Sequence, residues 1–448
     1  MRREPDQFIF LLGTLGNGRG KAFDSRCRET LEYESLNGSF APSGKSLTRA
    51  LAFLGACLLV SCQQGASTLE SATPGGQAQL SGTGAGTRAL SSTVNGERVG
   101  RGPVRVAMLL PNSASGASGR TGQEMANAAK MAMAELGKGR FELVLKDTRG
   151  QPAEASVLAA EARDEGSSLV LGPLFSANVS SASAVTQPAE IPMIGFSSDV
   201  ARARAGVYLL SFAPAADIRR TLRYGYSRGA TQTVAILPDN SYGRLAEREM
   251  RKTYDQLGAQ VVSVVRYSRS EGSIANAARS SGVAMVNANA IYIPEGGAVP
   301  ALVLNTLRKS GISLQDKQVM GSGQWSNMTR RDQVLNGAIY AGVDRTNFPD
   351  FAARYKAKHD NDPSVTAALG YDAIALASEL LRRNQRDPFA PNRIENRSGF
   401  RGVTGIFRFE SNGRLQRALV INRIESGKVV VESPAPTSFV GIGLRRSF

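Results

Sequence analysis

Short apolar runs alternate with helix-compatible segments along most of the chain after residue 103. The stretch 168–199 shows the repeating unit, with an apolar run at 168–172, a helix-compatible segment at 177–187 and a second apolar run at 192–196. Apolar runs of this length on either side of a helix are typical of a parallel β-α-β unit. The pattern therefore predicts two neighbouring parallel strands joined by a helix.

Small hydroxyl residues follow both of these predicted strands. Ser176 comes shortly after the first strand, and Ser197, Ser198 and Asp199 come directly after the second. In an open parallel sheet, ligands bind at the carboxyl ends of the strands. The two loops therefore predict a polar pocket at this edge of the sheet, although turn formation and helix capping are the other common roles of such residues.

The alternation of strands and helices occurs twice, which predicts an α/β fold with two doubly wound parallel-sheet lobes. In the first copy, the helix expected over 121–136 places Met125, Ala128, Ala129 and Ala132 on one face. The second copy begins after residue 212. The predicted strands of both copies are 104–110, 141–146, 168–172, 192–196, 233–237, 261–265, 290–293 and 318–320.

Two further strands, 403–409 and 419–424, flank an Asn412-Gly413 pair, which is a turn signal. We expect them to pair and to complete the second lobe. The predicted segments are an uncertain N-terminal extension (1–44), a signal peptide (45–61), a flexible tether rich in Gly, Ser and Thr (62–102), lobe 1 (103–212 plus 341–402), lobe 2 (213–340 plus 403–432) and a C-terminal tail (433–448). The extension reflects a start codon chosen too far upstream, a hypothesis that N-terminal sequencing tests.

The chain is strongly basic, with a formal net charge of +16 and a pI near 10.1. The arginines stand singly among Ala, Gly and Ser, and neither an aromatic-interleaved basic stripe nor a zinc-finger spacing accompanies them. This distribution favours a solvated basic surface over a nucleic-acid interface. We expect no nucleic-acid partner.

Cysteine and histidine usage restricts the chemistry further. The three cysteines are Cys27, Cys57 and Cys62, and His359 is the one histidine. A disulfide within residues 63–448 and a site with several histidine ligands are therefore excluded. A Ser-His-Asp triad would need His359, which lies in a run of charged residues expected at a helix end. We expect no metal, no cofactor and no catalytic activity.

Residues 45–62 have a basic start, an apolar stretch and small residues before a cysteine, which is typical of an export signal. Leu59-Val60-Ser61-Cys62 resembles the lipobox of bacterial lipoproteins, which implies that Cys62 is lipidated and becomes the first residue. Cys57 also fits the pattern, and an ordinary signal peptide is the other reading. Gln63 resembles the residue at this position in the outer-membrane version of such signals. The predicted location is therefore the periplasm, with a lipid anchor in a membrane, and the resemblance favours the outer membrane over the inner one.

The order of several short motifs resembles that of the type I periplasmic binding proteins, the family of leucine/isoleucine/valine receptors. The matching stretches are 106–111, Gly172-Pro173 with Ser176, 191–194 with Ser197, 239–243, 370–373 and 402–405. The resemblance implies two lobes joined by a three-crossover hinge near Phe212, Tyr340 and Gly402. It also implies a solute held between the lobes.

By this resemblance, the expected ligand-binding residues are Ser113, Ser176, Ser197, Ser198, Asp199 and Tyr242. Ser176 precedes a predicted helix, whose first N–H groups and dipole favour a ligand carboxylate. The chain departs from the amino-acid receptors at 321–324, Gly-Ser-Gly-Gln, where those receptors place an acid that meets the ligand ammonium. Asp199 or Glu295 is a possible substitute.

The resemblance implies a non-catalytic receptor that captures a small amino-acid-like solute for an ABC permease. The stretches 172–176, 195–199 and 207–212 look closer to lipoproteins described as penicillin-binding protein activators. Such a protein regulates peptidoglycan synthesis by contact with a penicillin-binding protein. This is the alternative function.

Overall fold

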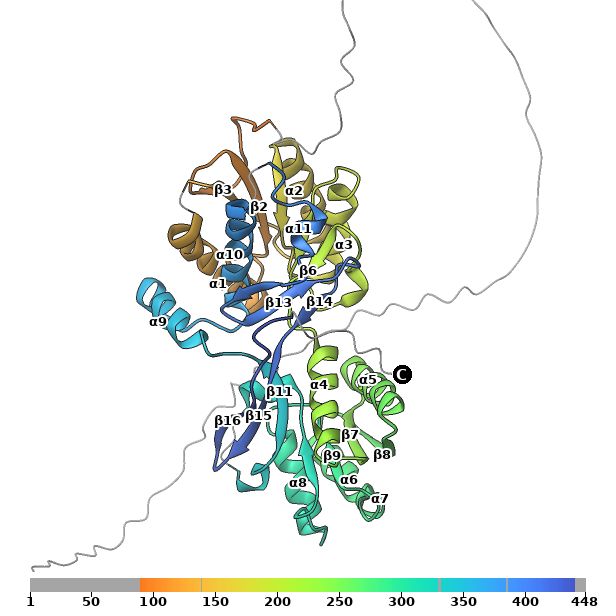
Figure 1. Cartoon of the computed structure of the whole chain (residues 1–448). Coiled ribbons are helices and arrows are strands. Elements are labelled where there is room, and N and C mark those ends of the chain that lie inside the picture. Colours follow the sequence, from red (N-terminus) through yellow and green to blue (C-terminus); the bar gives the residue numbers. More distant parts are fainter. Residues whose placement is uncertain (1–88, 138, 329–331, 384–385, 440–448) are drawn as a thin grey trace, which may run out of the picture. The chain divides into compact units, whose positions relative to one another are not determined.

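The computed structural model describes residues 89–439, except 138, 329–331 and 384–385. It contains two open sheets flanked by helices and a small third sheet (Figure 1). The extension 1–44, the signal peptide 45–61 and Cys62 lie outside the described residues. Within the described part of the chain, no helix is both long and apolar enough to cross a bilayer.

The first sheet has the strand order β1-β3-β2-β4-β5-β6, with β2 at its centre. Every residue of β2 is buried, as expected for a parallel strand covered on both faces. Helices α1 and α10 lie side by side on one face, and α2 and α3 cover the other (Figure 1). The bounds are β1 Glu97–Val99, β2 Val104–Leu110, α1 Gly116–Ala132, β3 Phe141–Asp147, α2 Pro152–Asp164, β4 Ser167–Leu171, α3 Ser176–Thr186, β5 Met193–Gly195, β6 Val207–Leu209 and α10 Ala367–Arg383.

The second sheet has the order β16-β15-β11-β10-β9-β7-β8. Helices α4 and α5 pack on one face, and α6 and α8 pack on the other. The bounds are α4 Pro214–Ser227, β7 Gln232–Pro238, α5 Ser241–Leu257, β8 Gln260–Tyr267, α6 Glu271–Ser280, α7 Gly282–Met285, β9 Ala290–Tyr292, α8 Val299–Lys309, β10 Gln318–Met320, β11 Ile339–Val343, β15 Leu419–Glu425 and β16 Lys428–Ser433. The predicted α/β class with two doubly wound, mainly parallel sheets is confirmed.

Strand pairing near the C-terminus differs from our prediction. The expected hairpin of 403–409 with 419–424 is wrong, because β13 (Gly405–Phe409) pairs with β12 (Phe400–Gly402) and β14 (Leu415–Arg417) in the third sheet. β15 pairs instead with β11 and β16. Phe407 and Phe409 are buried with residues of the first sheet, so this part of the predicted lobe 2 packs with the first sheet.

The chain passes between the two sheets at three places. The first, between β6 and α4, matches the crossover expected near Phe212. The second follows Val343 rather than Tyr340, because β11 belongs to the second sheet, and it leads to α9 (Phe348–His359). The third lies between Arg417 and Leu419 rather than at Gly402. Helix α11 (Pro391–Ile394) precedes the third sheet.

The predicted tether extends too far. β1, within the expected tether 62–102, pairs antiparallel with β3. Lys146 of β3 is completely buried, and its ammonium donates to the carbonyl of Asn95 (2.5 Å) and to Glu165 (2.9 Å). Buried charges need such partners, so this contact fixes the segment before β1 although its composition is that of a linker.

Candidate functional site

Two strand ends of the first sheet bring Ser176 and Asp199 together. Ser176 lies in the first turn of α3, after β4, and Asp199 lies in the loop after β5. The Ser176 hydroxyl donates a 2.6 Å hydrogen bond to Oδ2 of Asp199. Nε of Arg202 donates to both side chains, at 3.1 Å and 3.0 Å. The hydrogen bond from Ser176, with Arg202 beside it, lowers the pKa of Asp199.

A protein carboxylate therefore occupies the hydroxyl that we expected at a ligand carboxylate. An anionic ligand group at Ser176 would have to compete with Asp199 for the hydroxyl proton that Asp199 already accepts. Ser197 is buried, and its hydroxyl accepts the backbone N–H of Asp199 at 3.1 Å, so it shapes the same loop. These hydrogen bonds join Ser176, Ser197, Asp199 and Arg202 to one another.

Ser113 and Ser198 are both exposed. Ser113 follows β2, and its backbone N–H donates to Asp147 at the end of β3 (3.2 Å). Burial raises the pKa of Asp147, but hydrogen bonds from the Ser113 side chain and from nearby backbone N–H groups outweigh it, so that the pKa is lowered. The contact of Ser113 with Asp147 is a loop-forming one.

Tyr242 lies at the start of α5, at the corresponding edge of the second sheet. Its hydroxyl is 2.8 Å from the hydroxyl of Ser322, which in turn donates to the carbonyl of Pro294 at 2.5 Å. Burial raises the pKa of Tyr242, so the phenol stays protonated. Glu295, considered as a substitute acid, accepts a hydrogen bond from Tyr267. Tyr242 thus connects loops of the second sheet.

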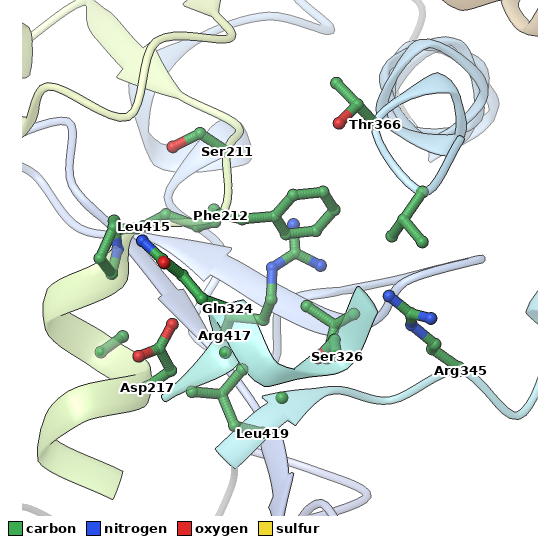
Figure 2. A pocket seen from close by; sticks show the side chains of 17 residues that line it. Ser211, Phe212, Asp217, Gln324, Ser326, Arg345, Thr366, Leu415, Arg417 and Leu419 are labelled. Carbon is green, nitrogen blue, oxygen red and sulfur yellow. The ribbon is translucent and has the colours of Figure 1, made fainter. Parts of the chain in front are cut away.

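A pocket of about 240 Å³ lies where the chain passes between the sheets, and we call it the hinge pocket (Figure 2). Its lining comes from all three crossover segments, from the loop before α10 and from the turn after β10. None of the six predicted ligand residues lines it. The lining residues come from 211–217, 323–326, 342–345, 365–366 and 415–419.

Two arginines, Arg345 and Arg417, line this pocket. A chain of buried hydrogen bonds holds Arg417, which lies at the end of β14. Its Nη1 donates to the carbonyl (2.9 Å) and to the hydroxyl (2.7 Å) of Thr404. The same hydroxyl donates to Asp372 of α10 at 2.6 Å, and the N–H of Val403 donates to the other oxygen of Asp372. Gly402 has no room for a side chain, since a Cβ there would lie 2.5 Å from Asp372.

The guanidinium of Arg417 is only partly satisfied. Nε and Nη2 are shielded from solvent and have no hydrogen-bond partner among the described residues. The rings of Phe212 and Phe407 lie over the group, with Cζ 5.1 Å and 5.3 Å from their centroids. Burial lowers the pKa of Arg417 to about 10, which leaves it positively charged at neutral pH.

Asp217, in the first turn of α4, is the acid of the hinge pocket (Figure 2). The backbone N–H groups of Gly323 and Ile218 donate hydrogen bonds to its carboxyl group, but Oδ1 is buried and has no partner in the part of the chain that the structure describes. Burial raises its pKa to about 8, which the backbone N–H of Gly323 and the charge of Arg219 offset only in part. At pH 7 this group is mostly an uncharged hydrogen-bond donor.

Sequence reasoning identified neither Asp217 nor Arg417 as a pocket residue. The stretches 370–373 and 402–405 did stand out as motifs, and the structure joins them through Asp372 and Thr404. That contact leads to Arg417, which in the sequence is one arginine among many. The described residues contain no cluster of three or more metal-ligating side chains.

Comparisons with known proteins agree with this architecture. The family model described as "Periplasmic binding protein" matches residues 103–428. The structure of a putative branched-chain amino acid ABC transporter from Rhodospirillum rubrum superposes with a TM-score of 0.63 at 19% identity, over 73% of this chain and 99% of that one. A branched chain amino acid ABC transporter periplasmic ligand-binding protein from Burkholderia xenovorans gives 0.59 at 18% identity, over 75% and 95%. At these identities the likeness shows the fold alone.

A curated relative is the penicillin-binding protein activator LpoA of Klebsiella pneumoniae, which is 22% identical over 326 residues. The match covers 65% of this chain and 45% of the relative, so the chain spans less than half the length of that protein. The family model covers most of the chain, and the two sheets with three crossovers are those expected from the resemblance. The chain belongs to the periplasmic binding protein family.

Proposed function

We propose that this chain is a non-catalytic, extracytoplasmic solute-binding protein that holds a small polar, amino-acid-like solute for an ABC-type importer. The hinge pocket carries the proposal, because the three segments that link the two sheets line it. A solute bound there contacts residues on both sides of the crossovers. Its binding therefore favours whichever arrangement of the two sheets it contacts best.

The size and chemistry of the hinge pocket suit a small solute. Its volume of about 240 Å³ lies below the range of about 300–1,000 Å³ that drug-sized ligands occupy. Apolar walls with a few polar groups are typical of ligand sites, and Arg417 and Asp217 are two of the polar groups here. The others are Ser211, Gln324, Ser326, Arg345 and Thr366. Ser113, Ser176, Ser197, Ser198, Asp199 and Tyr242 remain candidates for a second set of ligand contacts.

The solute-binding proposal is tested by native mass spectrometry of the purified chain, followed by thermal-shift measurements with a panel of common amino acids and small organic acids. We expect a bound small molecule, and a melting temperature that rises with the concentration of at least one panel member. A chain that carries no small molecule and whose melting temperature responds to none of the panel would contradict it.

We further propose a lipid anchor on Cys62, motivated by Leu59-Val60-Ser61-Cys62. In cell fractionation, Cys62→Ser should move the protein from the outer-membrane fraction to the soluble periplasm. Cys57→Ser is the matched control and should leave it in the membrane fraction. The opposite pattern would assign the anchor to Cys57, and release by neither substitution would leave no role for a lipobox.

A second candidate function is activation of a peptidoglycan synthase. Two observations favour it: Ser176, Asp199 and Arg202 hydrogen-bond to one another at the site where we expected a solute, and the chain is similar to a penicillin-binding protein activator. The test adds the purified chain to a purified bifunctional penicillin-binding protein and measures glycan polymerisation. A rate increase that needs no added solute favours the activator. An unchanged rate, together with a solute that raises the melting temperature, favours the receptor.

A further inference from the structure

One edge of the Arg417 guanidinium is unused. Nη1 is occupied by Thr404, whereas Nε and Nη2 have no hydrogen-bond partner among the described residues. These two N–H groups lie on the same side of the planar group and point in parallel directions. A carboxylate accepts such a pair with its two oxygens, which is the strong, bidentate form of the arginine–carboxylate contact. The unused edge therefore matches one specific ligand group.

No carboxylate among the described residues hydrogen-bonds to this edge. The oxygens of Asp372 accept hydrogen bonds from Val403 and Thr404, so Asp372 acts on Arg417 through its charge and through the Thr404 hydroxyl. Asp217 lines the same pocket, but the charge that acts on it is that of Arg219. Unpaired buried N–H groups on a charged side chain are costly, so this edge favours an anion that enters from outside.

The described lining of the pocket offers a ligand ammonium group a single carboxyl group. Asp217 is the one acid among its described lining residues, and its pKa of about 8 keeps it mostly protonated at neutral pH. A protonated carboxyl group donates a hydrogen bond to a ligand oxygen, but it does not neutralise a cation. The turn 321–324 also lacks an acid.

The remaining walls are apolar in one part and polar in another. Val343, Val365, Leu415 and Leu419 form the apolar part, and the ring of Phe212 lies over the guanidinium (Figure 2). The polar lining residues are Ser211, Gln324, Ser326, Arg345 and Thr366. In this conformation the unused N–H groups are shielded from solvent, so a ligand reaches them only after the side chains around Arg417 rearrange. Phe212, whose ring lies over the guanidinium, is in the first crossover segment between β6 and α4.

We propose that the hinge pocket binds a small organic acid with an apolar body, whose carboxylate pairs with the Nε and Nη2 edge of Arg417 and which carries no ammonium group. The protonated carboxyl group of Asp217 donates a hydrogen bond to the same ligand. This inference rests on the proposed solute-binding function, and it replaces the amino-acid-like solute named there by an acid that keeps the carboxylate of an amino acid and lacks its ammonium group.

The first experiment compares 4-methylpentanoate with leucine, which has the same carbon skeleton and an added α-ammonium group. Isothermal titration of the purified full chain at pH 7 should show binding of the acid, and leucine should bind at least about 10-fold more weakly. Tighter binding of leucine would overturn this inference and leave the proposed function standing. The inference would also be overturned, with the proposed function left standing, if an uncharged or cationic solute bound while 4-methylpentanoate, leucine and every other organic acid of the panel did not.

Two variants test the assigned roles. Arg417→Lys keeps the charge but loses the planar edge, and it should weaken the acid about 10-fold or more. Arg414→Lys, an exposed arginine of the same hairpin, is the matched control and should bind like the unchanged chain. Circular dichroism checks that both variants are folded. Equal affinities of the two folded variants would overturn the role of Arg417.

The pH dependence gives a readout that does not require Arg417 to be changed. Binding of the acid should weaken from pH 7 to pH 9, as Asp217 ionises and repels the ligand carboxylate. In Asp217→Asn this decline should vanish, whatever the affinity at pH 7. An equal decline in both proteins would overturn the role of Asp217. If no solute of any class binds, the proposed function fails together with this inference.

Discussion

The hydroxyl of Thr404 donates a hydrogen bond of 2.6 Å to the buried carboxylate of Asp372. The same hydroxyl accepts the 2.7 Å hydrogen bond from Nη1 of Arg417. Asp372 belongs to α10, which packs in the core of the first sheet, whereas Arg417 ends β14 beside the third crossover. Thr404 thus links helix α10 to Arg417 of the hinge pocket. The position of Arg417 therefore depends on Asp372, which is far from it in sequence.

Thr404→Val removes this link and preserves the shape of the side chain. Asp372 stays buried with one acceptor site unpaired, so we expect the free energy of unfolding to fall by about 1–3 kcal/mol. Urea denaturation measures the change. Thr346→Val is the matched control, because the Thr346 hydroxyl also donates to an aspartate at 2.6 Å but in an exposed position. It should change stability by less than about 0.5 kcal/mol. Equal losses would mean that burial of the Thr404 contact adds nothing.

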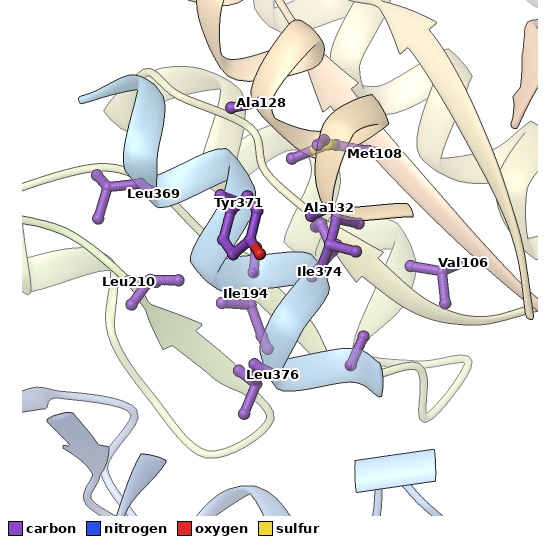
Figure 3. Close-up of a cluster of buried hydrophobic side chains, with 14 of the residues drawn as sticks. Val106, Met108, Ala128, Ala132, Ile194, Leu210, Leu369, Tyr371, Ile374 and Leu376 are labelled. Atoms are coloured by element: carbon purple, nitrogen blue, oxygen red, sulfur yellow. The ribbon is translucent and has the colours of Figure 1, made fainter. Parts of the chain in front are cut away.

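The motif 370–373 begins with a glycine, Gly370, that lies at a close contact between two helices. Helix α10 crosses α1 so closely that a Cβ on Gly370 would lie 2.3 Å from the carbonyl oxygen of Met125. Figure 3 shows Leu369, Tyr371 and Ile374 of this helix among the apolar side chains of β2 and α1. We expect Gly370→Ala to lower the free energy of unfolding by about 1–3 kcal/mol, because the two helices must move apart.

Gly272→Ala is the control for this prediction. Gly272 lies in the first turn of α6, with no atom within 4 Å of its virtual Cβ. Alanine there should leave stability unchanged or raise it by up to about 1 kcal/mol, because alanine is the better helix former. Thermal denaturation of both variants is the measurement. A neutral Gly370→Ala would show that α1 and α10 separate without cost.

The regular parts of the fold were predictable because they depend on local patterns. The apolar runs identified β2 to β5 of the first sheet and β7 to β10 and β15 of the second, but not β1, β6, β11 or β16. The expected bounds of the helix at 177–187 agree with α3 to within a residue. The third sheet was not predictable in this way. Asn412-Gly413 correctly indicated a turn, but the sequence of β13 does not distinguish pairing with β14 from pairing with β15.

The hinge pocket escaped prediction because its parts come from separate regions of the chain. Asp217 looks like an ordinary acid in the first turn of a helix, where a negative charge is favourable. Its burial comes from the turn at Gly323, more than a hundred residues later. Hydroxyl residues at strand ends gave a stronger signal, but Ser176 forms its hydrogen bond with Asp199 of the protein itself.

Substitution of Lys146 tests whether this side chain holds the segment before β1 against the first sheet. Its side chain is completely buried between Glu161 (3.0 Å) and Glu165 (2.9 Å). Lys146→Met leaves Glu165 buried without its cation, so we expect a loss of about 3–5 kcal/mol in the free energy of unfolding. Lys130→Met is the control, since Lys130 pairs with Glu97 at the surface, and it should cost at most about 1 kcal/mol. Limited proteolysis within 89–99 should be faster in the first variant only. Equal stability of the two variants would contradict a structural role for Lys146.

Asp217 should make the stability of the chain depend on pH. Burial raises its pKa from an ordinary value of 3.8 to about 8, so between these values the folded chain holds a proton that the unfolded chain has released. Folding then binds a proton, and the free energy of unfolding falls as the pH rises from about 4 to about 8. Asp217→Asn cannot ionise, so its stability should fall less over this range. Urea denaturation at intervals of pH measures the difference, with Asp316→Asn as an exposed control that should keep the slope of the unchanged chain. If Asp217→Asn keeps that slope as well, the carboxyl group is ionised in the folded protein at neutral pH, and the hinge pocket then contains an anion that can meet a ligand ammonium group.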